Sequence, residues 1–152
     1  MLDATDKKIL NLLQKDATLT NKQIAAELHL TVTPVFERIK KLKKNGQIKR
    51  IQAIVDRKKV GKPLLVLSEI SVSNHKQKNL SRFEKEVLSL KEVIECFHVS
   101  GRNDYVLKIV ANNMEDYRDF LVNKLAKIEG VSNVNSSFIL KELKEGSSIE
   151  LE

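Results

Sequence analysis

The chain is poor in several residue types on which particular kinds of protein depend: it has one cysteine, two prolines and no tryptophan among 152 residues. The single cysteine, Cys96, excludes an internal disulfide and argues against a zinc site built from cysteines. We expect it to be a small buried hydrophobic residue on a strand. No run of about 18 apolar residues occurs, and no apolar run follows positive charge at the N-terminus, so we predict neither a membrane span nor a signal peptide. Together these features indicate a cytoplasmic protein.

Signatures of catalysis are missing as well. His29, His75 and His98 have neither metal-ligand nor catalytic-triad spacing. The sequence contains no phosphate-binding loop, no dinucleotide-binding glycine motif and no nucleophile elbow. We therefore predict that the protein is not an enzyme, with no catalytic residue, no metal and no resident cofactor.

Positive charge is concentrated in the first part of the chain. Residues 1–62 carry fifteen Lys and Arg against six Asp and Glu, a net charge of +9, whereas residues 63–152 carry twelve against fourteen, a net charge of −2. A segment this basic is suited to neutralising phosphates. Binding to a membrane surface would require a bulky apolar helix face and interfacial Trp, which the chain lacks. Double-stranded DNA is therefore the predicted partner, and a membrane is not.

Residues 20–42 have the pattern of a helix-turn-helix. Thr20 can cap a first short helix, and Gln23, three residues later, completes a capping box. The apolar positions of this helix share one face: Ile24, Ala25 and Leu28. Two short helices joined by a tight turn also occur in many all-α domains. The basic charge of this segment favours a DNA-binding helix-turn-helix, in which the second helix enters the major groove.

The second helix opens at Thr31 or Thr33, either of which can cap it, and Pro34 fits its first turn. Its apolar stripe is predicted to consist of Val35, Ile39 and Leu42. Polar and basic side chains occupy the opposite face, with Arg38 on its flank. We predict that DNA is contacted by the following residues: Asn21, Lys22, Gln23, Thr31, Thr33, Pro34, Glu37, Arg38, Lys41 and Lys44.

A further helix is expected before this pair and an extended segment after it. Asp3 can cap a helix that runs to about Lys15, and Asn45-Gly46 suits a left-handed helix stop. Residues 48–55 are expected to be extended, as a linking strand. Gly61-Lys62-Pro63 marks a boundary, so we predict a DNA-binding domain over residues 1–62 and a second domain over residues 63–152.

In the second domain, segments whose apolar residues have the spacing of strands alternate with segments whose apolar residues have the spacing of helices. The expected order is βαββαβ, with strands over 64–73, 93–99, 105–111 and 131–143 and helices around 80–88 and over 114–128. This is an α+β, ferredoxin-like sandwich with both helices on one face of the sheet. We expect the other face to be apolar and uncovered, so that it buries itself against a second copy of the chain.

Several motifs together resemble those of the Lrp/AsnC, or feast/famine, family of transcription regulators, over essentially the whole chain. They are D-x-x-I-L-x-L-L over residues 6–13, T-P-x-x-E-R-I-K-x-L over 33–42, G-x-I over 46–48, E-C-x-x-V-S-G-x-x-D-Y over 95–105 and E-G-V over 129–131. The resemblance implies a winged helix-turn-helix domain, a linking strand, and a sandwich that dimerises and stacks dimers into an octamer or similar ring. It also implies DNA binding that responds to a small effector, commonly an amino acid.

The resemblance places the effector between dimers, near the turn at residues 101–104. Gly101 permits a positive φ or a close backbone approach, and Asp104 can accept a charge-assisted hydrogen bond from an ammonium group. The effector-binding residues it implies are His98, Gly101, Arg102, Asn103, Asp104, Tyr105 and Ser137. The same turn is also compatible with an ordinary hairpin connection, and His98 can line either the pocket or the subunit interface. A DNA-compacting architectural protein with little sequence specificity is the alternative function.

Overall fold

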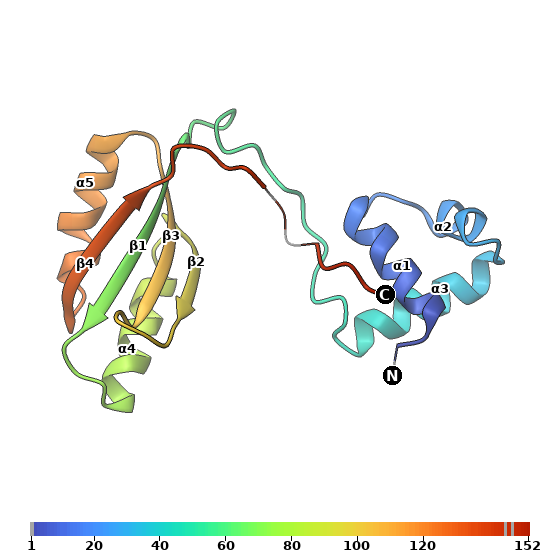
Figure 1. Cartoon of the computed structure of the whole chain (residues 1–152), viewed down its shortest axis with the longest axis horizontal. Coiled ribbons are helices and arrows are strands. Elements are labelled where there is room, and N and C mark those ends of the chain that lie inside the picture. Colours follow the sequence, from blue (N-terminus) through green and yellow to red (C-terminus); the bar gives the residue numbers. More distant parts are fainter. Residues whose placement is uncertain (1, 145, 147) are drawn as a thin grey trace. The chain divides into compact units, whose positions relative to one another are not determined.

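The computed structural model describes residues 2–144, 146 and 148–152, which form two compact units (Figure 1). We call the first unit the head: it comprises the chain up to Ile54 together with the tail that begins at Lys144. The second unit, the body, is Val55–Leu143. The chain thus leaves the head, forms the body and returns to the head, which the sequence did not predict.

The head contains the expected helices α1 (Ala4–Lys15), α2 (Asn21–Glu27) and α3 (Val32–Lys44). The N-caps predicted for α1 and α2 are confirmed. Asp3 caps α1 and Thr20 caps α2, each within a reciprocal capping box. These bonds satisfy amide groups that the first turn of a helix leaves without a partner, so the local sequence is sufficient to start both helices.

The turn between α2 and α3 is a Schellman motif. The amide of Leu30 donates to the carbonyl of Ala25 at 2.8 Å, and the amide of His29 donates to that of Ala26 at 3.2 Å. His29 has a φ of 55°, in the left-handed region that such a helix stop requires. Helix α3 then begins after Thr31, whose side chain makes no cap hydrogen bond.

The core of the head forms where the three helices meet. The predicted inward residues of α3 are confirmed, because Val35, Ile39 and Leu42 are all buried. They pack with Ile9 of α1 and Ile24 of α2, which are both fully buried. This core fixes the side of α3 that faces inward and leaves its other side to solvent.

Residues 48–55, all of which the structure describes, form neither helix nor strand. The linking strand predicted here is therefore wrong for the single chain. An extended segment becomes a strand when it forms backbone hydrogen bonds with a neighbouring strand. Among the described residues, no strand pairs with this segment. Ile51, Ile54 and Val55 are left exposed along it.

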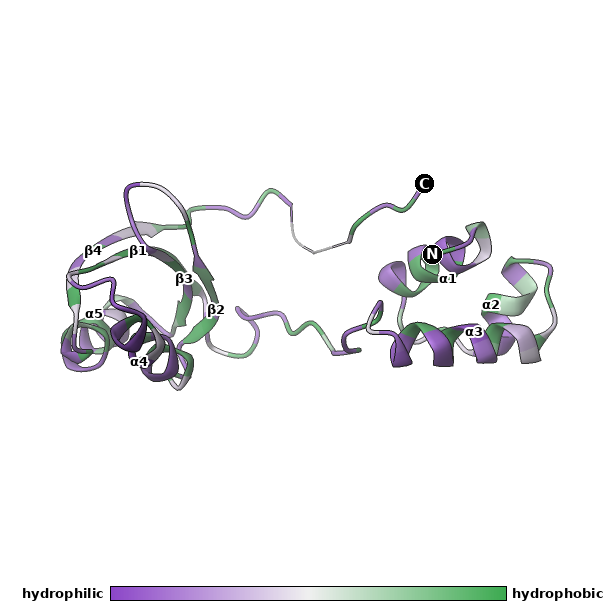
Figure 2. Ribbon diagram, turned by 90° about the horizontal axis from the view of Figure 1, so that it is seen from below, coloured by the Kyte–Doolittle hydropathy of each residue, from purple (hydrophilic) through white to green (hydrophobic). Residues whose placement is uncertain are grey.

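The body has the predicted βαββαβ order and is a ferredoxin-like sandwich. Its elements are β1 (Leu64–Val72), α4 (Gln77–Leu88), β2 (Val93–His98), β3 (Tyr105–Ala111), α5 (Met114–Asn123), a short 3₁₀ turn (Leu125–Lys127) and β4 (Val131–Phe138). The strands lie in the order β2-β3-β1-β4, and all neighbours are antiparallel. Helices α4 and α5 cover the same face of the sheet (Figure 2).

Strand β4 is shorter than predicted because its partner ends. In the antiparallel register Phe138 lies opposite Val66, and the amide of Ile139 still donates to the carbonyl of Leu65 at 3.0 Å. Strand β1 begins at Leu64, so residues further along the chain have no β1 residue to pair with. The hydrophobic pattern that continues to Leu143 therefore does not continue the strand.

The two faces of the sheet differ in composition. Alternate residues of β1 and β3, such as Ile70 and Leu107, form the core beneath the helices. Cys96 lies on a strand, β2, as expected, but it is partly rather than fully buried on this side; burial raises the pKa of its thiol. The face without helices, which we call the open face, was predicted to be apolar, and this is only partly correct. Strand alternation and register place on it Leu67, Phe97, Val106 and Val110, but also Glu69, Glu95, Lys108, Asn135 and Ser137.

Candidate DNA-binding and effector-binding sites

The solvent side of α3 carries a continuous stripe of exposed residues. Of the predicted DNA contacts, Thr33, Pro34, Glu37, Lys41 and Lys44 are exposed along the helix, and Thr31 is exposed at its N-cap. Their positions follow the three- and four-residue spacing of one helix face. The N-terminal half of this face carries small and polar groups, and the C-terminal half carries positive charge.

Phe36 lies within this stripe and was not predicted as a contact. Its residue surface is 47% exposed, and the Lys40 ammonium lies 6.0 Å from the centre of its ring. An aromatic side chain held at the surface of a basic helix can make apolar contact with the methyl group of thymine. Its spacing from Thr33 and Lys40 would have placed it on the solvated face from the sequence alone.

Arg38 is held differently from the way its sequence position suggested. Its Nη1 atom donates to Asp3 Oδ2 at 2.5 Å and to Asp6 Oδ1 at 2.6 Å. These carboxylates belong to the capping box of α1, and hydrogen bonding to them raises the pKa of Arg38. The backbone amide of Asp6 and then Arg38 lower the pKa of Asp3. Arg38 thus fastens α3 to the start of α1.

The predicted contacts in α2 have unequal access to a ligand. Lys22 is exposed and Asn21 is half-buried. Gln23 is used in the capping box, where its Oε1 accepts hydrogen bonds at 2.8 Å from both the amide and the hydroxyl of Thr20. Its side-chain oxygen therefore stabilises the helix start.

The turn before β3 is tied to the end of β1. Gly101 has a φ of 143°, and, its two chain neighbours aside, no atom of the described residues lies within 4 Å of the position that a Cβ would take. The predicted positive φ is thus confirmed, whereas no other described residue approaches this glycine closely. Asp104 closes the turn, because its amide donates to the Ile70 carbonyl and its carbonyl accepts from the Val99 amide, each at 2.9 Å. Gly101 and Arg102 are left exposed at the tip.

The carboxylate of Asp104 is engaged on both oxygens. Oδ2 accepts from the amide of Val72 at 2.8 Å, and Oδ1 lies 2.7 Å from Nε2 of His75. The hydrogen bond from Val72, together with that from His75, lowers the pKa of Asp104 against the opposing effect of burial. In this arrangement Asp104 fixes the turn to β1.

A polar cluster adjoins the turn on the open face, and its acidic member was missed by the sequence interpretation. Glu69 Oε2 accepts from Asn103 Nδ2 at 3.0 Å and from Asn135 Nδ2 at 3.4 Å. Ser71 donates to Asn103 Oδ1 at 3.1 Å. Ser137 follows Asn135 on the same side of β4. Among the described residues no cation lies within ion-pair distance of Glu69, so this carboxylate faces amides alone.

His98 and Tyr105 lie on the other side of the sheet. Their rings stack 4.6 Å apart, and Tyr105 is only 1% exposed. The Tyr105 hydroxyl donates to Glu84 Oε1 of α4 at 2.9 Å, and burial, together with Glu84, raises its pKa. The structure therefore separates the predicted effector residues: Asn103 and Ser137 are on the open face, whereas His98 and Tyr105 are on the helix-covered face.

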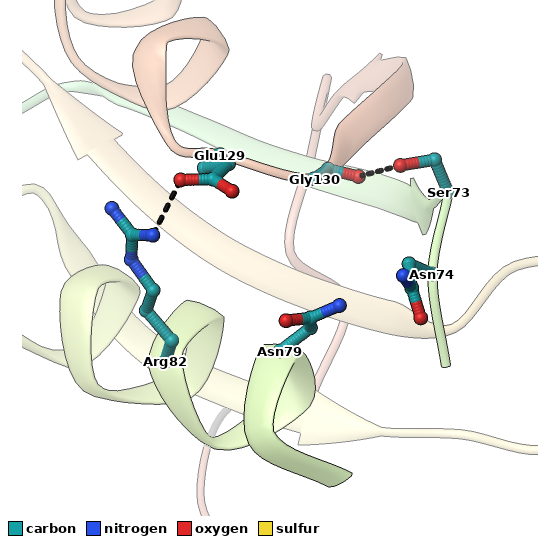
Figure 3. Close-up of a pocket in the computed structure, with 6 residues that line it drawn as sticks. All are labelled: Ser73, Asn74, Asn79, Arg82, Glu129 and Gly130. Carbon is teal, nitrogen blue, oxygen red and sulfur yellow. Dashed lines mark hydrogen bonds and ion pairs between the residues drawn. The ribbon is translucent and has the colours of Figure 1, made fainter. Parts of the chain in front are cut away.

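A polar pocket of about 160 Å³ lies on the helix-covered side (Figure 3). It is lined by Ser73, Asn74, Asn79, Arg82, Glu129 and Gly130. Arg82 of α4 forms ion pairs with Glu129 and Glu86, so its charge is already balanced. None of the residues predicted to bind an effector lines this pocket.

Two further observations concern the described part of the chain. No helix in it combines the length and apolar character that crossing a membrane requires. Nor does that part bring three or more His, Cys, Asp or Glu side chains together in a way that would hold a metal ion.

Models of two protein domains match the chain in the order of its units. A winged helix-turn-helix DNA-binding model matches residues 2–49, and an Lrp/AsnC ligand-binding domain model matches residues 65–149. The first match covers the helices of the head. The second covers more than half of the chain and includes the sheet of the body except Leu64, the first residue of β1.

Individual relatives match over nearly their full lengths. The chain is 34% identical to the transcriptional regulator AzlB of Bacillus subtilis, covering all of this chain and 97% of that protein. It is also 34% identical to the leucine-responsive regulatory protein of Haemophilus influenzae, covering 99% and 90%. The crystal structure of a Neisseria meningitidis transcriptional regulator in complex with L-Met superposes with a TM-score of 0.93 at 30% identity, covering 98% and 96%. As its motifs predicted, the chain belongs to the Lrp/AsnC family and is a ligand-responsive transcriptional regulator.

Proposed function

We propose that the protein is a cytoplasmic, non-catalytic regulator that reads specific DNA sites and senses an amino acid. Residues 1–62 supply DNA binding and the linker, and residues 63–152 supply effector binding and assembly. The main support is the separation of the two chemistries: a basic helix face in the head and an acidic, amide-lined patch in the body.

Helix α3 is assigned to the major groove. Its exposed N-terminal residues Thr31, Thr33 and Pro34 meet base edges, and Phe36 contacts a thymine methyl group. The lysines of its C-terminal half, with Lys22, meet phosphates, which position the helix without reading sequence. Asn21 and Glu37 flank this surface, and Arg38 and Gln23 hold the two helices in place.

Titrating labelled DNA at several salt concentrations tests this assignment. Phe36→Ala is expected to weaken binding to the specific site more than binding to random DNA. Lys44→Ala is expected to weaken both alike and to lower the slope of log K against log salt by about 0.9 for one lost phosphate contact. Equal effects of Phe36→Ala on both DNAs would refute base reading by this ring. A footprint of discrete sites is expected, and continuous coverage would favour the compacting function instead.

The effector is assigned to the 101–104 turn and the neighbouring part of the open face. Glu69 is suited to bind an α-ammonium group, because a charged donor bonds a carboxylate more strongly than an amide does. The exposed Gly101 backbone and Arg102 are suited to the α-carboxylate, and Asn103 and Ser137 border the same site. Asp104 maintains the turn, and Tyr105 supports it from the core. The L-Met complex of the Neisseria regulator is consistent with an amino-acid ligand.

A thermal-shift screen of the twenty amino acids would identify the effector. Glu69→Gln is expected to remove the shift given by the best ligand. Glu95→Gln is the matched control, because Glu95 is a carboxylate on the same face that already pairs with Lys108 at 3.2 Å. An undiminished shift in Glu69→Gln would place the ammonium group elsewhere.

The assembly is assigned as a homodimer that builds an octamer or similar ring. Apolar side chains exposed in the single chain support it: Ile54 (85%), Leu140 (99%), Leu143 (87%) and Phe97 (51%). Covering such residues is a usual reason for a protein surface to associate with a second copy. Two α3 helices in a dimer would then read half-sites one DNA turn, or a multiple of it, apart.

A further inference from the structure

The tail of the chain lies along α1 as an extended segment, residues 148–152 (Figure 1). Asn11 Nδ2 donates to the Leu151 carbonyl at 2.9 Å, and Asn11 Oδ1 accepts from the Leu151 amide at 3.1 Å. Gln14 repeats this pattern with Ile149, at 2.9 and 2.8 Å. Each side-chain amide therefore pairs with both backbone groups of one tail residue, as a neighbouring β-strand would.

The contacts are spaced so that the rise along α1 about equals the length of the extended tail, which runs in the opposite direction. Lys7, Asn11 and Gln14 form one stripe of α1, and the Lys7 ammonium donates to the carbonyl of Glu152. Seven helical residues rise about 10.5 Å at 1.5 Å each. Three steps of an extended chain, from Ile149 to Glu152, cover about 10 Å at 3.3 Å each. The stripe can therefore engage the tail along its whole length.

An apolar anchor accompanies the backbone pairing. Leu151 is partly buried and packs against the core of the head, whereas Ile149 is 70% exposed and Glu150 is exposed. Backbone pairing alone would accept almost any extended peptide. Leu151 supplies the side-chain selectivity, and its pairing with Asn11 is the more shielded of the two.

We propose that the Lys7–Asn11–Gln14 stripe of α1 is a docking site for an extended peptide, and that its occupant is residues 148–152 of the same chain. Docking gives the head a second connection to the body, in parallel with the linker that leaves the head at Ile54. Release of the tail leaves the chain segment that follows Ile54 as the remaining connection. The docking site depends on neither DNA nor effector, and it can be tested without them.

The first experiment measures docking in a chain that lacks residues 148–152. A peptide with the sequence of residues 143–152 is added while the side-chain NH₂ resonances of Asn11 and Gln14 are followed by NMR. Both are expected to shift, with saturation. Replacing the leucine at position 151 of the peptide by alanine is expected to weaken binding about tenfold, because most of the buried apolar surface is lost. Replacing the glutamate at position 150 is the matched control, with less than about a twofold change expected.

The second experiment uses thermal melts of the full chain, the tail-deleted chain, Asn11→Ala/Gln14→Ala, and the combination. Alanine itself favours a helix, and the tail-deleted background isolates that effect. The double substitution is expected to lower the melting temperature more in the full chain than in the deleted chain. Additive effects, together with a peptide that leaves both NH₂ resonances unchanged, would overturn the proposal.

A third experiment mixes two variants, one without the tail and one without the docking stripe, to test whether the tail docks on its own chain or on another copy. The tail-deleted chain, ¹⁵N-labelled, keeps its docking stripe, and unlabelled Asn11→Ala/Gln14→Ala chains keep their tails. The chains are mixed at equal concentrations, held well below the dissociation constant that the peptide titration gives, so that a tail supplied only by diffusion leaves the docking stripe empty. The shifted NH₂ resonances are then expected to stay absent. Their appearance would mean that the tail docks across copies and would overturn the assignment to its own chain.

Discussion

Arg38→Ala is expected to destabilise the head rather than to remove a base contact. The guanidinium bonds two carboxylates at the start of α1, at 2.5 and 2.6 Å. The Asp6 side chain is 13% exposed, so its carboxylate would be left nearly buried after truncation, which costs about 1–3 kcal/mol. The Asp3 side chain is 52% exposed, and losing its ion pair with Arg38 contributes little to the destabilisation because water screens the pair. A loss of about 2 kcal/mol lowers the melting temperature of a domain this small by roughly 8–16 °C.

Circular dichroism melts and DNA titrations of the same variants separate the two roles of Arg38. Lys41→Ala is the matched control, because it removes one positive charge from the exposed face of α3 without touching α1. A double-mutant cycle with Asp6→Asn is expected to give a coupling of about 0.5–3 kcal/mol. Unchanged melting of Arg38→Ala, combined with loss of binding to a specific site alone, would refute the structural role and restore the base contact.

Three further predictions concern acid stability, the helix-turn-helix turn and assembly. The lowered pKa of Asp104 contributes stability that is fully present above its ordinary value of 3.8 and is lost as pH falls through the lowered value. In urea titrations at several pH values, Asp104→Asn is therefore expected to make the free energy of unfolding fall less steeply as the pH is lowered. An unchanged dependence on pH would show that Asp104 does not contribute. His29→Gly is expected to raise the stability of the head by up to about 1 kcal/mol, because glycine adopts a φ of 55° without the steric cost that histidine bears; a lower melting temperature would contradict this. Light scattering of the full chain at micromolar concentration is expected to give a dimer or a larger species, and a stable monomer would refute the proposed interface.

Features fixed by neighbouring residues could be predicted from the sequence. The N-cap at Asp3, the capping box at Thr20 and the buried stripe of α3 are local, since the residues that form each of them lie three or four positions apart. The βαββαβ order followed from alternating periods in the same way. The end of β4 could not be predicted, because it depends on where β1 begins, more than sixty residues earlier.

The candidate sites were predictable in position more than in role. The helical spacing of residues in α3 placed Thr33 and Lys44 on its exposed face. An ion pair between α3 and α1 leaves no pattern in the sequence, so Arg38 was predicted to contact DNA. Glu69 was missed because, in the sequence, it is a single polar residue within a predicted strand. Its hydrogen bond with Asn103, which brings it next to the turn, is visible only in the folded structure. The tail on α1 depends on side-chain amides pairing with the backbone of remote residues, which no periodicity reveals.

The return of the tail to α1 has a consequence for how the protein is made. During synthesis the head can close its core around Ile9, Ile24 and Val35 as soon as α3 has left the ribosome, since domains generally fold as units from the N-terminal side. Its docking stripe stays uncovered while the whole body, residues 55–143, is translated. A newly made head therefore exists first with a vacant peptide-binding face. Until residues 148–152 are synthesised, a neighbouring nascent chain or a chaperone has the opportunity to occupy it.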